Sequence, residues 1–238
     1  MSGHNKWSQI KHKKALTDAK KGKLFSKLSR LITISAREKG GDPNINASLK
    51  MIIDRARTLN MPIDNIERAI KKGTGELEGS KIEELILEAY GPGGAALIIE
   101  GTTDNRNRTI SEIKFLLSEH NGKLAEPGSV IWLFEHVGII NIEKPNNKSA
   151  EEIEMAALES GCQDWKWLDE QNLEIYTKPE ELEKIKKALE AAGLKIGESS
   201  LAWKPKNEAP QSNQAQLEKL MEELDEHDDI NEIYTNSN

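Results

Sequence analysis

Cysteine is almost absent from this chain of 238 residues, since Cys162 is the only one. A single cysteine excludes intrachain disulfides and zinc clusters built from cysteine thiolates. Long apolar runs are also missing, because no stretch approaches the roughly 18 residues that a membrane helix needs. The segment 1–7 is polar and basic, without the apolar core of a signal peptide. We therefore expect a cytoplasmic protein that makes no membrane contact.

Groupings of catalytic residues are equally scarce. Cys162 has no histidine beside it, and the glycines of 91–94 precede an expected strand, whereas a phosphate-binding loop precedes a helix. The acidic run 225–229 resembles a metal site only superficially, and we interpret it as a solvated helix end followed by a turn. Five histidines lie scattered over different segments: His4, His12, His120, His136 and His227. We expect no enzymatic activity, cofactor, metal or small-molecule substrate.

Charge is abundant but unevenly distributed. The whole chain has a net charge of -7, which by itself indicates no nucleic-acid partner. Residues 1–75, however, hold 17 basic and 6 acidic residues, whereas the remaining chain holds 16 basic and 34 acidic ones. The first segment therefore carries +11 and the rest -18. Such asymmetry predicts a polyanionic partner for residues 1–75 and leaves a protein partner open for the acidic remainder.

Helical periodicity dominates residues 1–75 after an extended tail of about eight residues. The pattern predicts a first helix over 8–21, which Gly22 should break, and a second helix that ends before Gly40. We expect Asn44 to cap a third helix that buries Ile45.

A fourth helix is predicted to begin near Pro62, because proline suits the first helical turn. It should bury Ile63 and end at Gly73. The segment would then be a small bundle with a basic exterior.

The basic residues of this segment are candidate contacts to phosphates, together with two arginines at the start of a later helix. Trp7 either stacks on a base or packs on the bundle. For the helical residues a solvated charged face is the alternative, and for Arg106 and Arg108 it is pairing with neighbouring carboxylates. The candidate nucleic-acid-binding residues are His4, Lys6, Trp7, Lys11, His12, Lys13, Lys14, Lys20, Lys21, Lys23, Lys27, Arg30, Arg37, Arg68, Lys71, Lys72, Arg106 and Arg108.

Residues 76–238 change to an α+β pattern. A hairpin is expected over 82–100, a helix after Thr103–Thr109 and a strand over 129–135. Residues 138–206 follow the order β-α-β-β-α-β of a ferredoxin-like domain. A last helix and strand would complete the earlier β-β-α segment. We therefore predict a multi-domain α+β protein: a basic arm and helical domain (1–75), a discontinuous α+β domain (76–135 with 208–238) and an inserted ferredoxin-like α+β domain (136–207).

Several motifs resemble the YebC/PmpR family over nearly the full length. They are GHNKWSQIKHKK (3–14), GGDP (40–43), NMPIDNIERAIKKG (60–73), YGPGG (90–94), TDNRNRT (103–109) and GSV (128–130). The resemblance implies a helical N-terminal domain and two α+β domains, one inserted in the other. Family members are described as cytoplasmic DNA-binding transcriptional regulators, and some, including mitochondrial relatives, as ribosome-associated translation factors. The resemblance brings no enzymatic activity or cofactor.

Two targets therefore stay open for the basic segment. A DNA-binding regulator agrees with the family description, although no clear helix-turn-helix is present. A translation factor that binds ribosomal RNA agrees with a lysine-rich tail containing a tryptophan, because irregular RNA is recognised by stacking and phosphate contacts. We take DNA as the leading target.

Overall fold

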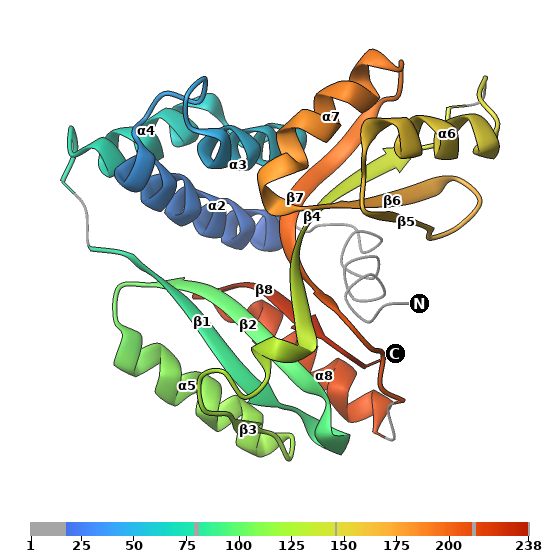
Figure 1. The fold of residues 1–238 in the computed structure, drawn as a ribbon. Coiled ribbons are helices and arrows are strands. Elements are labelled where there is room, and N and C mark those ends of the chain that lie inside the picture. The colour runs from blue at the N-terminus through green and yellow to red at the C-terminus, as the bar shows by residue number, and fades with distance from the viewer. Residues whose placement is uncertain (1–17, 79–80, 146, 211–212, 238) are drawn as a thin grey trace. The chain divides into compact units, whose positions relative to one another are not determined.

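The computed structural model describes residues 18–78, 81–145, 147–210 and 213–237, apart from the side chains of residues 18–20. The chain divides into a smaller compact unit of residues 135–204 and a larger unit in which residues before 135 join those after 204. Each unit has its own four-stranded sheet (Figure 1). This confirms the predicted mixed α+β class. A domain boundary at residue 75 stays a prediction, because the larger unit contains both the helical segment and the first sheet.

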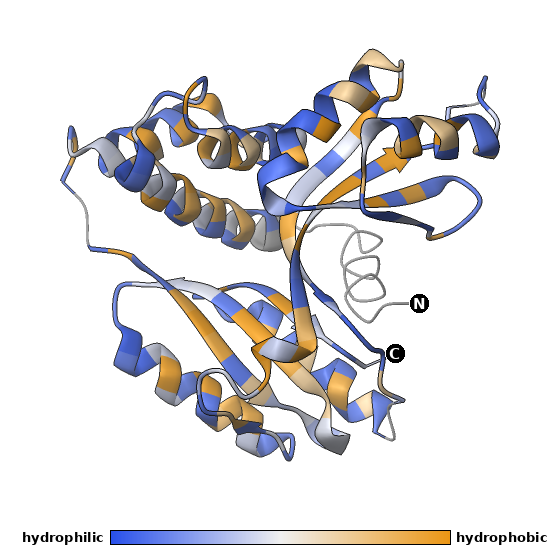
Figure 2. Ribbon diagram, in the orientation of Figure 1, coloured by the Kyte–Doolittle hydropathy of each residue, from blue (hydrophilic) through white to orange (hydrophobic). Residues whose placement is uncertain are grey.

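Among the described residues, three helices form the helical segment of the larger unit: α2 (Asp18–Lys39), α3 (Ala47–Thr58) and α4 (Ile63–Thr74). Most of the helix predicted over 8–21 lies outside the described residues. Apolar side chains from all three meet in one core, and α2 in Figure 2 shows hydrophobic bands between hydrophilic ones. The buried members of this core are Leu28, Ile32, Ala36, Leu49, Ile53, Ala56, Met61, Ile66 and Ala69. The expected helical bundle is therefore present.

Several predicted helix details are wrong, beginning with the break at Gly22, which lies inside α2. A glycine costs a helix only about 1 kcal/mol, which a long packed helix tolerates. The cap of α3 is Asn46, whose side chain accepts from the Leu49 N–H. Asn44 is unsuitable because its own N–H groups donate to the Asp42 carboxylate.

The end of α4 also differs from the prediction. Gly75 caps the helix with a φ of 83°, a left-handed conformation that favours glycine. Gly73 lies inside α4, where a Cβ atom would collide with the Thr33 carbonyl oxygen of α2. It therefore permits close packing of the two helices. Ile45 and Ile63, expected inside, are 80% and 66% exposed.

The first sheet has the strand order β3-β1-β2-β8, and all three of its pairings are antiparallel. Helices α5 and α8 pack against it, and their apolar residues join those of the strands in one core (Figure 1). Residues 213–237 thus complete the β-β-α segment, as predicted, with β-β-α-β-α-β as the order along the chain. The elements are β1 (Glu83–Tyr90), β2 (Ala96–Thr103), α5 (Arg106–Glu119), β3 (Lys123–Leu124), α8 (Gln214–Glu226) and β8 (Ile230–Thr235).

Only the last two residues of the strand predicted over 129–135 lie in a strand, which is β4 (Phe134–Glu143). A loop leads into the short 3-10 helix η2 (Ile131–Leu133) in its place. The Glu88 carboxylate of β1 accepts from the N–H groups of Gly128, Val130 and Ile131 at 2.5, 2.6 and 2.7 Å. These N–H groups are therefore occupied and not available to a strand ladder.

The smaller unit has the predicted order β-α-β-β-α-β and the sheet order β5-β6-β4-β7. Its helix α6 begins with a complete capping box between Ser149 and Glu152. Its elements are β4 (Phe134–Glu143), α6 (Ala150–Ser160), β5 (Asp164–Trp167), β6 (Asn172–Thr177), η3 (Pro179–Glu181), α7 (Leu182–Ala191) and β7 (Ile196–Pro205).

The chain leaves the larger unit and returns to it at neighbouring points. The Lys206 N–H donates to the Leu133 carbonyl oxygen at 2.9 Å, and the Lys206 ammonium donates to the Trp132 carbonyl oxygen at 2.9 Å. Residues 135–204 are therefore an insertion whose two ends meet.

Candidate nucleic-acid interface

The predicted binding residues fall into three groups. The first lies outside the described residues, as does the side chain of Lys20: His4, Lys6, Trp7, Lys11, His12, Lys13 and Lys14. For these residues the binding role stays a prediction.

The second group consists of basic residues that face solvent. Arg68, Lys71 and Lys72 lie at positions i, i+3 and i+4 of α4, on the side away from the buried Ile66 and Ala69. The remaining exposed members are Lys21 and Arg37 of α2 and Arg106 at the start of α5. Their charged groups are accessible to a ligand in solution.

The third group forms contacts inside the chain. Lys23, Lys27 and Arg30 lie at i, i+4 and i+7 along α2, and all three contact residues 225–229, which we call the anchor turn. Lys27 donates to the Asp225 carbonyl oxygen at 2.7 Å and is only 7% exposed. Lys23 donates to the Glu226 carbonyl oxygen at 3.1 Å. This stripe of α2 thus binds the last carbonyl groups of α8.

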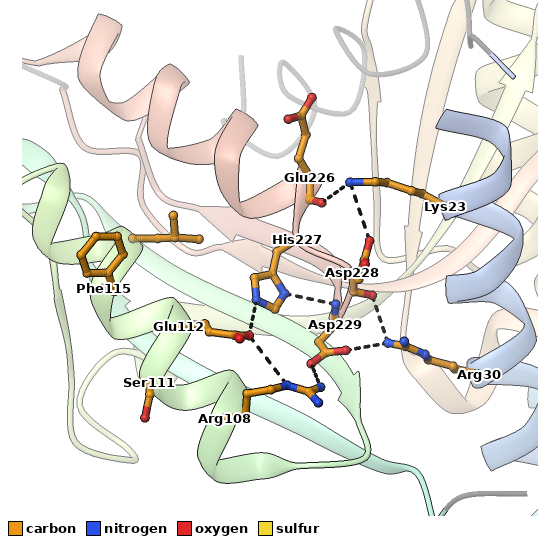
Figure 3. Close-up of a pocket in the computed structure, with 11 residues that line it drawn as sticks. Lys23, Arg30, Arg108, Ser111, Glu112, Phe115, Glu226, His227, Asp228 and Asp229 are labelled. Carbon is orange, nitrogen blue, oxygen red and sulfur yellow. Dashed lines mark hydrogen bonds and ion pairs between the residues drawn. The ribbon is translucent and has the colours of Figure 1, made fainter. Parts of the chain in front are cut away.

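Asp229 is the centre of this contact (Figure 3). Arg30 donates to its Oδ1 at 2.7 Å, whereas Arg108 and Thr109 donate to its Oδ2 at 2.8 and 2.6 Å. Burial alone would raise the pKa of Asp229, but hydrogen bonds from Thr109, Arg108 and Arg30 outweigh it and lower the pKa to about 2. The carboxylate therefore stays ionised and joins α2 to α5.

Arg108 has the carboxylate partners that we considered as the alternative to phosphate. It lies in the first turn of α5, where a cation is unfavourable beside the helix dipole. Asp229, at 2.8 Å, and Asp104, at 3.0 Å, compensate for this position and raise the pKa of Arg108. In this arrangement Arg108 pairs with carboxylates of its own chain, and its contact to a phosphate stays a prediction.

Between α2, α5 and the anchor turn lies an open cleft of about 820 Å³ (Figure 3). Three basic and four acidic residues line it, so it has no surplus of positive charge for a phosphate. The lining residues are Lys23, Arg30, Arg108, Ser111, Glu112, Phe115, Leu116, Glu226, His227, Asp228 and Asp229. The cleft by itself therefore does not favour an anionic ligand.

Three residues of the cleft have ligand atoms close enough to hold a metal ion, namely Glu112, His227 and Asp229, whose atoms lie within 4.8 Å of one another. The geometry does not suit a metal. Nδ1 of His227 accepts from the Asp229 N–H at 3.1 Å, so the neutral ring carries its proton on Nε2, 3.0 Å from Glu112. Both oxygens of Asp229 already face guanidinium groups. The three candidate ligands are thus already engaged in hydrogen bonds within the chain, and the guanidinium groups of Arg30 and Arg108 would repel a cation.

The anchor turn was predicted as a solvated helix end, and this is wrong for Asp229, which is 3% exposed. Gly101 explains why the turn comes so close to the sheet. A Cβ atom at Gly101 would collide with the Asp229 carbonyl oxygen, to which the Thr102 N–H donates at 2.8 Å. The predicted strand ends at residue 100, whereas β2 continues through Gly101 to Thr103, and a glycine inside a strand is typical of such a close approach.

Comparison with known proteins identifies the family of this chain. A family model described as the TACO1/YebC protein N-terminal domain matches residues 5–76, and one described as the TACO1/YebC second and third domain matches residues 82–237. The chain belongs to the TACO1/YebC family. This confirms the resemblance found in the sequence motifs.

Relatives of the TACO1/YebC family are similar over almost their whole length. A probable transcriptional regulatory protein of Thermoanaerobacter pseudethanolicus is 48% identical over 99% of this chain and 96% of its own. One of Caldanaerobacter subterraneus is 45% identical over 99% of this chain and 98% of its own. The crystal structure of a conserved hypothetical protein from Aquifex aeolicus has a TM-score of 0.87 and 44% identity, covering 98% of this chain and 96% of that one. The names of the first two support a regulatory role for this TACO1/YebC protein. In the part of the chain that the structure describes, no helix is long and apolar enough to cross a membrane.

Proposed function

We propose that this protein is a non-enzymatic, nucleic-acid-binding regulator of gene expression, with DNA-binding transcriptional regulation as its leading form. The observation that carries this proposal is the charge of +11 on residues 1–75, against -18 on the rest of the chain. Neutralisation of phosphates by clustered lysines and arginines releases counterions, which is the main source of affinity in non-specific nucleic-acid binding. The acidic remainder would repel nucleic acid and leaves its surface for a protein partner. We also propose a cytoplasmic location, which the resemblance to the YebC/PmpR family implies.

The exposed face of α4 and the basic arm are the surfaces we assign to phosphate contacts. Arg68, Lys71 and Lys72 have exposed side chains on one face, and the core holds the opposite side of the helix. The arm adds Lys11, Lys13 and Lys14 within four positions. Such a spread of charges suits a ligand with regularly spaced phosphates.

The test of this proposal is a salt titration of binding to a fluorescein-labelled DNA duplex and to a ribosomal RNA fragment. Binding should weaken with salt by a slope of about 0.9 per phosphate contact on a log–log plot for duplex DNA. The changes Arg68→Glu, Lys71→Glu and Lys72→Glu together, or Lys11→Glu, Lys13→Glu and Lys14→Glu together, should weaken binding and flatten the slope.

Lys184→Glu, Lys187→Glu and Lys195→Glu together are the matched control, because they also reverse three exposed basic residues, in the smaller unit. Equal effects of the control and the α4 variant would contradict the assignment to α4. Crosslinking in cells with sequencing of both DNA and RNA then identifies the target. Enrichment of ribosomal RNA alone would refute transcriptional regulation and favour a translation factor.

A further inference from the structure

The contact between α2 and the anchor turn has the chemistry of a protein–phosphate contact. A helix C-terminus carries partial negative charge, because its last carbonyl groups lack intrahelical partners. In α8 the carbonyl oxygens of Asp225 and Glu226 accept from lysines of α2. The carboxylates of Asp228 and Asp229 add two formal negative charges directly after them. The basic side chains of α2 therefore meet a cluster of negatively charged oxygen acceptors, as they would at the phosphates of a nucleic-acid backbone.

The basic groups engaged by the anchor turn belong to the segment that we assign to nucleic-acid binding. Lys23, Lys27 and Arg30 form one stripe of α2, and each of them donates to the anchor turn or its carboxylates. They cannot donate the same hydrogens to a phosphate while this contact is closed. Self-contact and ligand contact therefore compete.

The contact is graded from a loose rim to a buried centre. At the rim, Lys23 and Asp228 lie 3.7 Å apart, with side chains 54% and 70% exposed. At the centre, the side chain of Asp229 is 4% exposed and accepts from Arg30 at 2.7 Å. Exposed ion pairs are weak and exchange partners readily, whereas buried charged pairs are held by the cost of leaving a charge unpaired. The rim is thus where an incoming phosphate can displace an internal carboxylate.

We propose that the anchor turn is an autoinhibitory phosphate mimic: it occupies the basic stripe of α2, and nucleic acid gains a contact when a phosphate displaces Asp228 from Lys23 at the rim. This rests on the proposed function and specifies how that binding surface is regulated. The binding-competent state is the one in which the rim is open, so the apparent affinity is reduced by the fraction of molecules in which it is closed.

The experiment compares the full-length wild type with Asp228→Asn and with Glu119→Gln. Both variants remove one negative charge from an exposed side chain, but Glu119 lies in the last turn of α5, outside the lining of the cleft. For the labelled DNA duplex at low salt, Asp228→Asn should bind up to about fivefold more tightly than Glu119→Gln, the equivalent of about 1 kcal/mol. Its salt slope should steepen by up to about 0.9, because Lys23 gains a phosphate.

Hydrogen exchange supplies a second readout that does not depend on a variant. Saturation of the wild type with the duplex should accelerate exchange of the backbone N–H groups of 226–230, because the turn loses its partners on α2. Asp228→Asn should raise this exchange without nucleic acid, because it removes the ion pair with Lys23 at the rim.

The outcomes separate the two proposals. If the wild type and Glu119→Gln bind the duplex with the affinity of Asp228→Asn, and the turn keeps its exchange rate on binding, the contact is purely structural and the mimic is refuted while the function stands. If the wild type binds neither duplex nor ribosomal RNA but Asp228→Asn does, both proposals are supported. If no variant binds either probe, the proposed function fails and the mimic fails with it.

Discussion

Replacement of Asp229 by asparagine should destabilise the larger unit by about 2 kcal/mol near pH 7. The size follows from the pKa of Asp229, which falls from 3.8 to about 2 because hydrogen bonds from Thr109, Arg108 and Arg30 outweigh burial. A folded-state pKa below the unfolded one stabilises the protein above the unfolded value of 3.8, and this stabilisation disappears as the pH falls toward 2. The difference in unfolding free energy between wild type and variant should therefore be constant from about pH 7 to about pH 5 and shrink below about pH 4.

The free energy of unfolding of the larger unit is measured in urea, with hydrogen exchange in peptides that cover β2 and β8 as the signal. These peptides do not include residues 135–204. Asp228→Asn is the control, because its exposed carboxylate makes one ion pair at 3.7 Å, worth at most about 1 kcal/mol. An Asp229→Asn protein as stable as the control at neutral pH would refute the role of Asp229. A difference that persists unchanged below pH 3 would refute the electrostatic origin of the effect.

Three further predictions concern packing, a loop and a cap. Gly73→Ala should lower stability by about 1–3 kcal/mol in thermal melting, because the added Cβ would collide with a backbone oxygen of α2, whereas Gly22→Ala, with nothing within 4 Å, should raise it by up to about 1 kcal/mol. Equal melting temperatures for the two variants would contradict the close approach. Glu88→Gln should weaken three hydrogen bonds and destabilise loop 126–131 by about 1–3 kcal/mol, seen as faster hydrogen exchange there; an unchanged rate would rule this out. Asn46→Ala removes the cap of α3 and should cost about 1–2 kcal/mol in urea unfolding, and a midpoint like that of the wild type would show that the cap is dispensable.

The elements that sequence predicted well are those with a clear local period. The order β-α-β-β-α-β of residues 135–204 and the stripes of α2 to α4 follow from apolar spacing, which reflects burial on one face. Isolated residues were less reliable. Gly22 stays helical because the core contacts of α2 that begin at Leu24 and Phe25 outweigh its own preference, and Asn44 loses the capping role to Asn46 through a competing bond to Asp42.

The larger errors of prediction arise where a residue's hydrogen-bond partner is distant in the sequence. The apolar run 129–135 predicts a strand, but the carboxylate of Glu88, some forty positions earlier, accepts hydrogen bonds from the N–H groups of Val130 and Ile131. In the same way, the pattern of Lys23, Lys27 and Arg30 shows that these residues are basic and lie on one face. It contains no information on whether their partner is an external phosphate or the anchor turn, two hundred positions later.

The single hydrogen bond between Lys206 and Leu133 has a consequence for how this architecture tolerates change. Since the insertion enters and leaves the larger unit at adjacent residues, a change in its length does not alter the distance that a connection between Leu133 and Lys206 has to span. A short glycine linker from Leu133 to Lys206 could replace the whole of 135–204 and still let β8 complete the first sheet. We therefore expect a protein with this shortened connection to keep the pairing of β2 with β8 and the core that the first sheet shares with α5 and α8.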